Sequence, residues 1–142
     1  MKLSTKSTYG LRAMLHIALN INNGPVSITG IAKSEGISVT YLEQLLNTLK
    51  HKDLLKSVRG PKGGYVLAKK ISAITVADIV SALEGDIYPV HCIGSGRKTA
   101  ACKNKSGCVP KIVWLKLARA IHDCLGAITL EHLCKEARKI EK

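Results

Sequence analysis

The sequence predicts a mainly α-helical fold that carries a single two-stranded β-hairpin. Apolar residues recur at helical spacing in six segments, and Ser or Thr residues that suit helix N-caps precede most of them. One Gly- and Pro-rich stretch separates two short runs of strand-forming residues. At 142 residues the chain is long enough for one modest core with a short appended element, but not for two independent cores.

The first helix is predicted over about residues 4–21. Its apolar positions follow the i, i+3, i+4, i+7 spacing of one helix face, and these positions are Leu11, Met14, Leu15 and Ala18. The Asn-Asn-Gly-Pro sequence at residues 22–25 consists of turn formers, so the helix is expected to end there.

Two short helices joined by a glycine turn are expected next. Ser27 suits the N-cap of the second helix, Gly36 the turn, and Ser38 the N-cap of the third helix. The expected inward-facing residues are Ile28, Ile31 and Ala32, then Leu42, Leu45, Leu46 and Leu49. This arrangement is typical of a helix-turn-helix over about residues 27–51, although an ordinary corner between two helices has the same pattern.

A β-hairpin is predicted over about residues 54–68, directly after the third helix. Two short strands, 54–58 and 65–68, flank the sequence Arg-Gly-Pro-Lys-Gly-Gly, which suits a hairpin tip and excludes a helix. A hairpin with Arg59 and Lys62 at its tip, behind a candidate recognition helix, is typical of the wing of a DNA-binding domain. The alternative is a surface hairpin with incidental charge. The pattern therefore favours a winged helix-turn-helix.

Three further helices complete the expected fold. Thr75 and Asp78 form a capping box, and that helix is expected to stop at Gly85. Pro110 suits the first position of a long helix that reaches Leu125. This helix has two apolar stripes, one with Val113, Leu117, Ile121 and Cys124 and one with Trp114, Ala118 and Leu125. A small domain cannot cover both stripes, so a long C-terminal dimerisation helix is expected. A last helix is predicted after Thr129.

The chain is strongly basic, and the excess lies mainly in its first half. The formal net charge is +12, and Lys and Arg outnumber Asp and Glu by 11 to 3 over residues 1–75 and by 11 to 7 over residues 76–142. Such a surplus attracts polyanions, of which nucleic acid is the commonest. The chain has no Phe and one Trp, which disfavours a single-strand binder built on aromatic stacking.

Three cysteines gather in a loop that is expected over residues 85–109. Nine residues separate Cys92 from Cys102, five separate Cys102 from Cys108, and the sequence between them is rich in Gly and Lys. Thiols in such a segment suit metal, cluster or redox chemistry, because nearby cations favour the thiolate. Cys124 and Cys134 stand on apolar helix faces and are expected in the core.

We expect a cytoplasmic protein, because no stretch resembles a signal peptide or a membrane span. Five cysteines in a reducing compartment favour ligation or sensing over structural disulfides. A thiol enzyme is disfavoured, because the sequence has neither Cys-x-x-Cys nor a Cys with a positioned His and acid.

The sequences Ile-Ser-Val-Thr-Tyr-Leu-Glu-Gln-Leu at 37–45 and Ser-Val-Arg-Gly-Pro-Lys-Gly-Gly-Tyr at 57–65 resemble the IscR/NsrR/CymR family of bacterial winged-helix transcription regulators. The start of the chain, residues 2–11, and residues 128–130 resemble the family as well. The resemblance implies a homodimer that binds a palindromic operator in duplex DNA. It divides the chain into a DNA-binding domain (1–84), a cluster-binding cysteine loop (85–109), and a dimerisation helix with a C-terminal helix (110–142).

The resemblance also implies the DNA-binding residues. These are Ser4 and Lys6 beside the phosphate backbone, Thr40, Tyr41, Glu43 and Gln44 on the recognition helix, and Arg59, Gly60 and Lys62 on the wing. Gln44 can hydrogen-bond adenine, and Glu43 can accept from cytosine while it repels phosphate. Glu43 is otherwise a solvated helix residue.

Family members that resemble IscR hold an iron–sulfur cluster through three cysteines of this loop. Cys92, Cys102 and Cys108 are therefore the expected ligands, of either a two-iron or a four-iron cluster. Such loops usually have a histidine ligand three residues past the last cysteine, but here that position is Lys111. The fourth ligand is left open between His91, a residue of the other subunit, a small thiol and solvent.

The sequence thus predicts a repressor of iron–sulfur cluster assembly genes that senses its own cluster. The alternatives are a CymR-like regulator of cysteine and sulfur metabolism, or a zinc or thiol-redox sensor that uses the same loop. CymR-like members lack the three cysteines and act through a partner enzyme.

Overall fold

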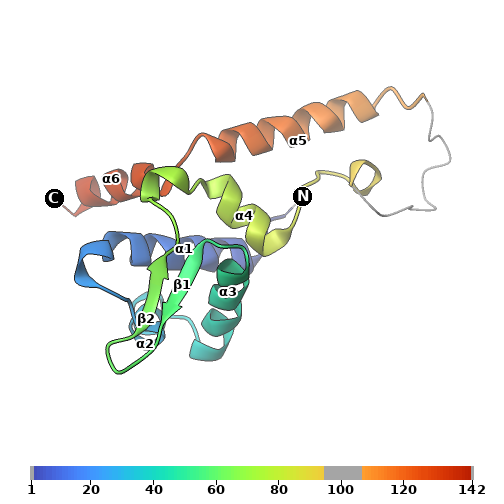
Figure 1. Cartoon of the computed structure of the whole chain (residues 1–142). Coiled ribbons are helices and arrows are strands. Elements are labelled where there is room, and N and C mark those ends of the chain that lie inside the picture. The colour runs from blue at the N-terminus through green and yellow to red at the C-terminus, as the bar shows by residue number, and fades with distance from the viewer. Residues whose placement is uncertain (1, 95–106, 142) are drawn as a thin grey trace.

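The computed structural model describes residues 2–94 and 107–141, and over these ranges it confirms the mainly helical winged helix-turn-helix (Figure 1). The helices are α1 (Thr5–Leu19), α2 (Ile28–Glu35), α3 (Val39–His51), α4 (Val76–Glu84), α5 (Lys111–Gly126) and α6 (Leu130–Ile140). The strands are β1 (Leu55–Val58) and β2 (Gly64–Leu67), and three short 3-10 helices are η1 (Ile21–Asn23), η2 (Ile71–Ala73) and η3 (His91–Ile93). Within the described ranges, no helix is long and apolar enough to cross a membrane.

Short polar side chains begin the helices where the sequence predicts them. The side-chain oxygens of Ser27, Ser38 and Thr129 each accept a hydrogen bond from the backbone N–H three residues later. Thr75 and Asp78 form the reciprocal capping box, with bonds of 3.1 and 2.9 Å. These bonds satisfy N–H groups that have no partner within the helix, so the N-caps predicted from the sequence are confirmed.

Helix α1 lies at the centre of the molecule. It contacts α2 and α3 of the helix-turn-helix as well as α4 and α6, and Figure 1 shows the wing on one side of α1 and α4, α5 and α6 on the other. Its inward face, formed by Ala13, Met14, Ile17 and Ala18, is buried. The hydrophobic face of α1 therefore holds the DNA-binding half and the C-terminal half of the chain together.

The first turn of α1 is hydrogen-bonded to the last residue of α4. A single carboxylate oxygen, Glu84 Oε1, accepts from the Ser4 backbone N–H at 2.9 Å, from the Ser4 hydroxyl, and from the Ser7 hydroxyl at 2.7 Å. Burial tends to raise the pKa of Glu84, but hydrogen bonds from Ser4 and Ser7 to the charged form outweigh it, so the pKa lies below its usual value. Glu84 is therefore held as a carboxylate between two segments that are far apart in sequence.

The hairpin is antiparallel and is tied to the start of α2. Strands β1 and β2 pair from Leu55 opposite Leu67 to Val58 opposite Gly64. Next to this sheet, Val26 and Tyr65 exchange two backbone hydrogen bonds of 3.0 and 2.9 Å. The wing is thus anchored to the residue that precedes the helix-turn-helix.

Helix α5 has no buried residue within a single chain. Trp114, Ala118 and Leu125 are half-buried, whereas Val113 and Cys124 are exposed. The expectation that Cys124 lies in the core is wrong for the single chain, because α5 directs Cys124 and Val113 away from the other described elements, although Ile121 of the same stripe is half-buried. Cys134 is buried as expected.

Gly64 provides a test of the wing anchor. Its φ of 153° is unfavourable for other residues, and a Cβ there would collide with the carbonyl oxygen of Val26. We expect Gly64→Ala to lower the free energy of unfolding by about 2–4 kcal/mol in urea titrations, because the Val26–Tyr65 bridge must open.

Gly60→Ala is the matched control. Gly60 also has a positive φ, of 111°, but a Cβ would meet open space, so about 1–2 kcal/mol is expected. Equal losses in the two variants would contradict the anchoring role of the Val26 contact.

Candidate nucleic-acid interface

Helix α3 buries one face and presents the other to solvent. Leu42, Leu45, Leu46 and Leu49 lie in the core, as the sequence predicts. On the other side Thr40, Glu43 and Gln44 are exposed, and Tyr41 is half-buried. Gly36 has the left-handed conformation, with φ 65° and ψ 36°, which lets the chain turn sharply from α2 into α3. Thr40, Glu43 and Gln44 are therefore accessible from solvent, and their role in recognition stays a prediction.

Tyr41 joins α3 to the first turns of α1. Its hydroxyl lies 3.2 Å from Thr5 Oγ1, and its ring meets the Tyr9 ring edge-on, with the centroids 6.1 Å apart. The Arg12 guanidinium carbon lies 5.9 Å from the centroid of the Tyr9 ring, within cation–π distance. The start of α1 thus stands beside the start of the recognition helix, where exposed Lys6 adds a positive charge.

Ser4 has a structural role in addition to the predicted phosphate contact. Its hydroxyl donates to Glu84 and accepts from the Lys6 backbone N–H, so it caps α1. A hydroxyl has one donor and two acceptor sites, so these bonds leave it one acceptor site and no second proton to give to a phosphate. The phosphate contact of Ser4 stays a prediction.

The wing tip is basic and accessible. Arg59, Gly60 and Lys62 are all exposed, and a hydrogen bond of 3.0 Å from the Gly63 N–H to the Gly60 carbonyl closes the turn. Glycine at the tip lets the backbone come close to a sugar-phosphate chain, and an arginine fits a narrow minor groove. The sheet positions these groups on the side of α1 that also carries the helix-turn-helix (Figure 1).

Glu43 places a negative charge within this basic region. Burial raises the pKa of the Tyr65 hydroxyl, and the Glu43 carboxylate raises it further. Helix α3 also contacts strand β1, so the recognition helix and the wing lie next to each other. The accessible face of α3 thus carries a carboxylate in a part of the chain, residues 1–75, where Lys and Arg outnumber Asp and Glu by 11 to 3.

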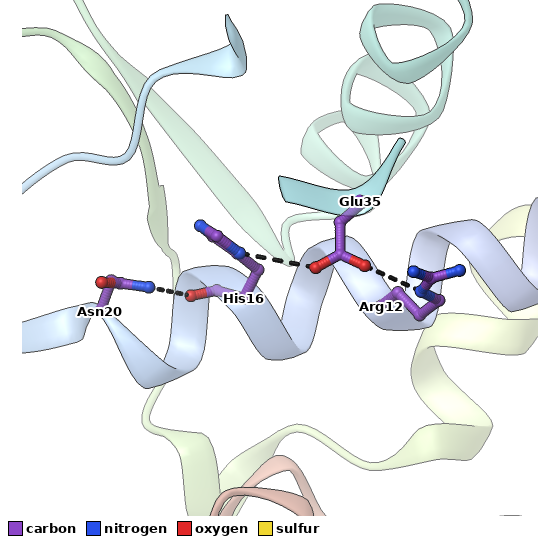
Figure 2. Close-up of polar contacts among 4 residues, drawn as sticks. All are labelled: Arg12, His16, Asn20 and Glu35. Atoms are coloured by element: carbon purple, nitrogen blue, oxygen red, sulfur yellow. Dashed lines mark hydrogen bonds and ion pairs between the residues drawn. The ribbon is translucent and has the colours of Figure 1, made fainter. Parts of the chain in front are cut away.

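An ion-pair cluster that sequence reasoning missed fixes α2 against α1. Figure 2 shows Glu35, at the end of α2, between two side chains of α1. Arg12 Nε lies 2.8 Å from one carboxylate oxygen and His16 Nδ1 3.5 Å from the other, while Asn20 Nδ2 donates to the His16 carbonyl at 2.8 Å. The i, i+4 spacing of Arg12 and His16 indicates that both side chains lie on one face of a helix. Their partner, Glu35, is identified only by the structure.

Of the three cysteines in the 85–109 segment, the structure describes two, Cys92 and Cys108, which stand on either side of the residues it does not describe. Cys92 is exposed in η3, and Cys108 is half-buried two residues before Pro110. Cys102 lies outside the described residues. The η3 turn contacts α5, so both ends of the segment lie at this helix.

The donor set suits a soft metal or an iron–sulfur cluster, because thiolates ligate both. Among the residues that the structure describes, no three His, Cys, Asp or Glu side chains come together as a metal site. His91 is exposed beside Cys92, and Lys111 is the first residue of α5. Lys111 cannot ligate iron as an ammonium, so the three cysteines remain the predicted ligands.

Comparison with known proteins agrees with this arrangement. The family model described as "Rrf2: Iron-dependent Transcriptional regulator" matches residues 3–136. The transcriptional regulator IscR of Xenorhabdus nematophila is 36% identical over 141 residues, which cover 99% of this chain and 84% of that protein.

Two solved structures are similar to this chain in both fold and sequence. The IscR of T. potens has a TM-score of 0.80 at 38% identity, covering 100% of this chain and 92% of that one. CymR of B. subtilis, called a global cysteine regulator, has a TM-score of 0.79 at 36% identity, covering 96% and 98%. These relatives are transcription regulators and not enzymes. The chain therefore belongs to the Rrf2 family of transcription regulators.

Proposed function

We propose that this regulator is a homodimeric repressor of iron–sulfur cluster assembly genes, and that its operator affinity responds to a cluster held by Cys92, Cys102 and Cys108. The observation that carries the proposal is the position of the cysteines. They stand between a winged helix-turn-helix and a long helix with an exposed apolar stripe, and the described ends of their segment both lie at that helix. IscR-named relatives support the cluster part of the proposal.

In this account, residues 1–84 bind DNA. Gln44 and Glu43 face base edges, and Thr40 and Tyr41 lie at the start of the same helix. Arg59, Gly60 and Lys62 follow the minor groove or its phosphates, while Ser4 and Lys6 approach the backbone. The carboxylate of Glu43 disfavours sequences that offer it no donor, which would give the protein selectivity.

Residues 85–109 form the sensing part. A bound cluster would make the protein sensitive to cellular iron, sulfide and oxidants, because these set whether the cluster is present and what its oxidation state is. The chain supplies three thiolates, of which Cys92 is exposed to reagents. Because Lys111 stands at the position three residues past Cys108, the fourth ligand must be another group, outside the three cysteines.

Residues 110–142 form the dimer. Val113 and Leu117 of α5 are exposed large apolar side chains one turn apart on the same face, and exposed Cys124 lies two turns further along that face. A stripe of this kind on one helix is stabilised when a second copy of the same helix covers it. Two wings related by a two-fold axis would match an operator with two half-sites.

A CymR-like role in sulfur metabolism is the second candidate. The fold similarity to CymR is as strong as that to IscR. The three thiols of the segment favour the cluster-dependent role, and metal content separates the two.

The first prediction concerns the cysteines. After anaerobic reconstitution, we expect the wild-type chain to bind iron and sulfide. It should also absorb in the visible range, because iron bound to sulfur ligands has charge-transfer transitions there. The triple variant Cys92/Cys102/Cys108→Ala should bind neither.

Cys134→Ala is the control for this test, because Cys134 is buried and burial raises the pKa of its thiol, so it is a poor ligand. Equal iron and sulfide in the triple variant would rule out the segment as the site, and zinc without sulfide in the wild type would favour the zinc-sensor alternative.

The second prediction concerns the wing. On a duplex enriched from a randomised pool by the wild-type protein, Lys62→Ala should weaken binding and reduce the slope of log K against log salt by about 1.8, since each of the two wings of the dimer loses one phosphate contact. Lys139→Ala, on α6 across α1 from the wing, removes the same charge and should change neither quantity. Identical effects of the two variants would show that Lys62 acts only through net charge.

The third prediction concerns α5. Val113→Glu combined with Leu117→Glu should convert the dimer to a monomer in sedimentation velocity and weaken operator binding by at least about 100-fold, because two half-sites are no longer bound together. Arg119→Glu, on the polar side of the same helix, should leave the dimer intact. A wild-type monomer, or a double variant that stays dimeric, would refute this interface.

A further inference from the structure

Glu84 lies between the cysteine segment and the DNA-binding half of the chain. It is the last residue of α4, and Gly85 follows it with φ 78° and ψ −160°, a conformation that turns the chain toward Cys92. Its carboxylate accepts three hydrogen bonds from Ser4 and Ser7 of the DNA-binding half. Any displacement of the start of the segment therefore acts directly on a residue that holds α1.

The same turn of α1 contacts the recognition helix. Thr5 directly follows Ser4, and its hydroxyl lies 3.2 Å from the Tyr41 hydroxyl. One turn later, the Tyr9 ring meets the Tyr41 ring edge-on. Consecutive residues of one helical turn move together, so Ser4 and Thr5 connect Glu84 to Tyr41 by direct contacts at every step.

The remainder of α1 is held by other contacts. The Arg12–Glu35 ion pair of 2.8 Å fixes the middle of α1 to α2, and Met14 and Ile17 of α1 are buried in the core. These contacts keep the body of α1 in place while its first turn depends on Glu84. The first turn is thus the part of α1 that the end of α4 can reposition.

We propose that Glu84 is a positioning residue that transmits the conformation of the segment beginning at Gly85, through Ser4 and Thr5, to Tyr41 of the recognition helix. This inference rests on the proposed function, since it takes α3 as the helix that binds DNA. The hydrogen bonds to a carboxylate are charge-assisted and stronger than neutral ones. Loss of the acceptor leaves three donors without their partner, so the first turn of α1 must rearrange.

The test compares native-state conformations of metal-free protein by ¹H–¹⁵N NMR, because amide chemical shifts report conformation and not stability. Glu84→Ala should shift the amides of the first turn of α1 and also those of residues 40–44 in α3. Glu84→Gln keeps one side-chain acceptor and should restore most of the wild-type shifts. Operator affinity should fall by about fivefold in Glu84→Ala and recover in Glu84→Gln.

Asp78→Asn is the matched control, because it weakens the capping bonds at the other end of α4 without contact to α1. Its shift changes should stay near Thr75. In the background of Thr5→Val, which removes the hydroxyl contact to Tyr41 and leaves the Tyr9 ring contact, Glu84→Ala should cause clearly smaller shifts in α3 than in the wild-type background.

Unchanged α3 shifts in Glu84→Ala, or equal α3 shifts in Asp78→Asn, would overturn the inference. So would full α3 shifts from Glu84→Ala in the Thr5→Val background. Failure of the proposed function appears separately, as a wild-type chain that does not bind the selected duplex. In either case the NMR shifts show whether Glu84 is coupled to Tyr41 through Ser4 and Thr5.

Discussion

The burial of the inner face of α1 is the interaction on which the rest of this structure depends. Met14 and Ile17 are buried at the junction of the two halves of the chain, and truncation of such a side chain costs about 2–5 kcal/mol. The helix-turn-helix packs on one side of α1, and α4 and α6 pack on the other. The candidate DNA-binding residues and the cysteines lie in different parts of the sequence, and α1 packs against elements of both parts.

Polar contacts then fix the orientation of elements that the apolar core alone would leave less defined. Arg12 and His16 hold Glu35 at the end of α2, Glu84 holds the first turn of α1, and backbone bonds hold Tyr65 of the wing to Val26. Each of these contacts is directional, whereas hydrophobic burial is not. A recognition helix and a wing must match one groove geometry, so this directional support bears on DNA binding as well as on stability.

Local signals in the sequence were sufficient for most of the fold. The caps at Ser27 and Ser38, the left-handed Gly36 and the hairpin tip around Gly60 depend on neighbouring residues, and all were predictable from them. The bonds of Glu84 to Ser4 and Ser7 were not predictable, because they join residues about eighty positions apart and exist only after α1 and α4 pack.

The error at Cys124 has a similar origin. Helical periodicity identifies an apolar stripe but does not state whether the same chain or a second copy covers it. In this chain Val113 and Cys124 of that stripe are exposed, and Cys134 on α6 is buried. The candidate DNA-binding residues followed from sequence likeness. Their arrangement on one side of α1 required the structure, and the position of Cys102 lies outside the described residues.

The central claim is that the state of the cysteine segment sets the affinity of the winged helix for DNA. The most direct test is an anaerobic anisotropy titration of one selected operator duplex, at fixed salt, with cluster-loaded and cluster-free wild-type protein. The account predicts dissociation constants that differ by at least about fivefold, as expected for a coupling free energy of about 1 kcal/mol or more. Superimposable titration curves from protein with full and zero cluster content would contradict it.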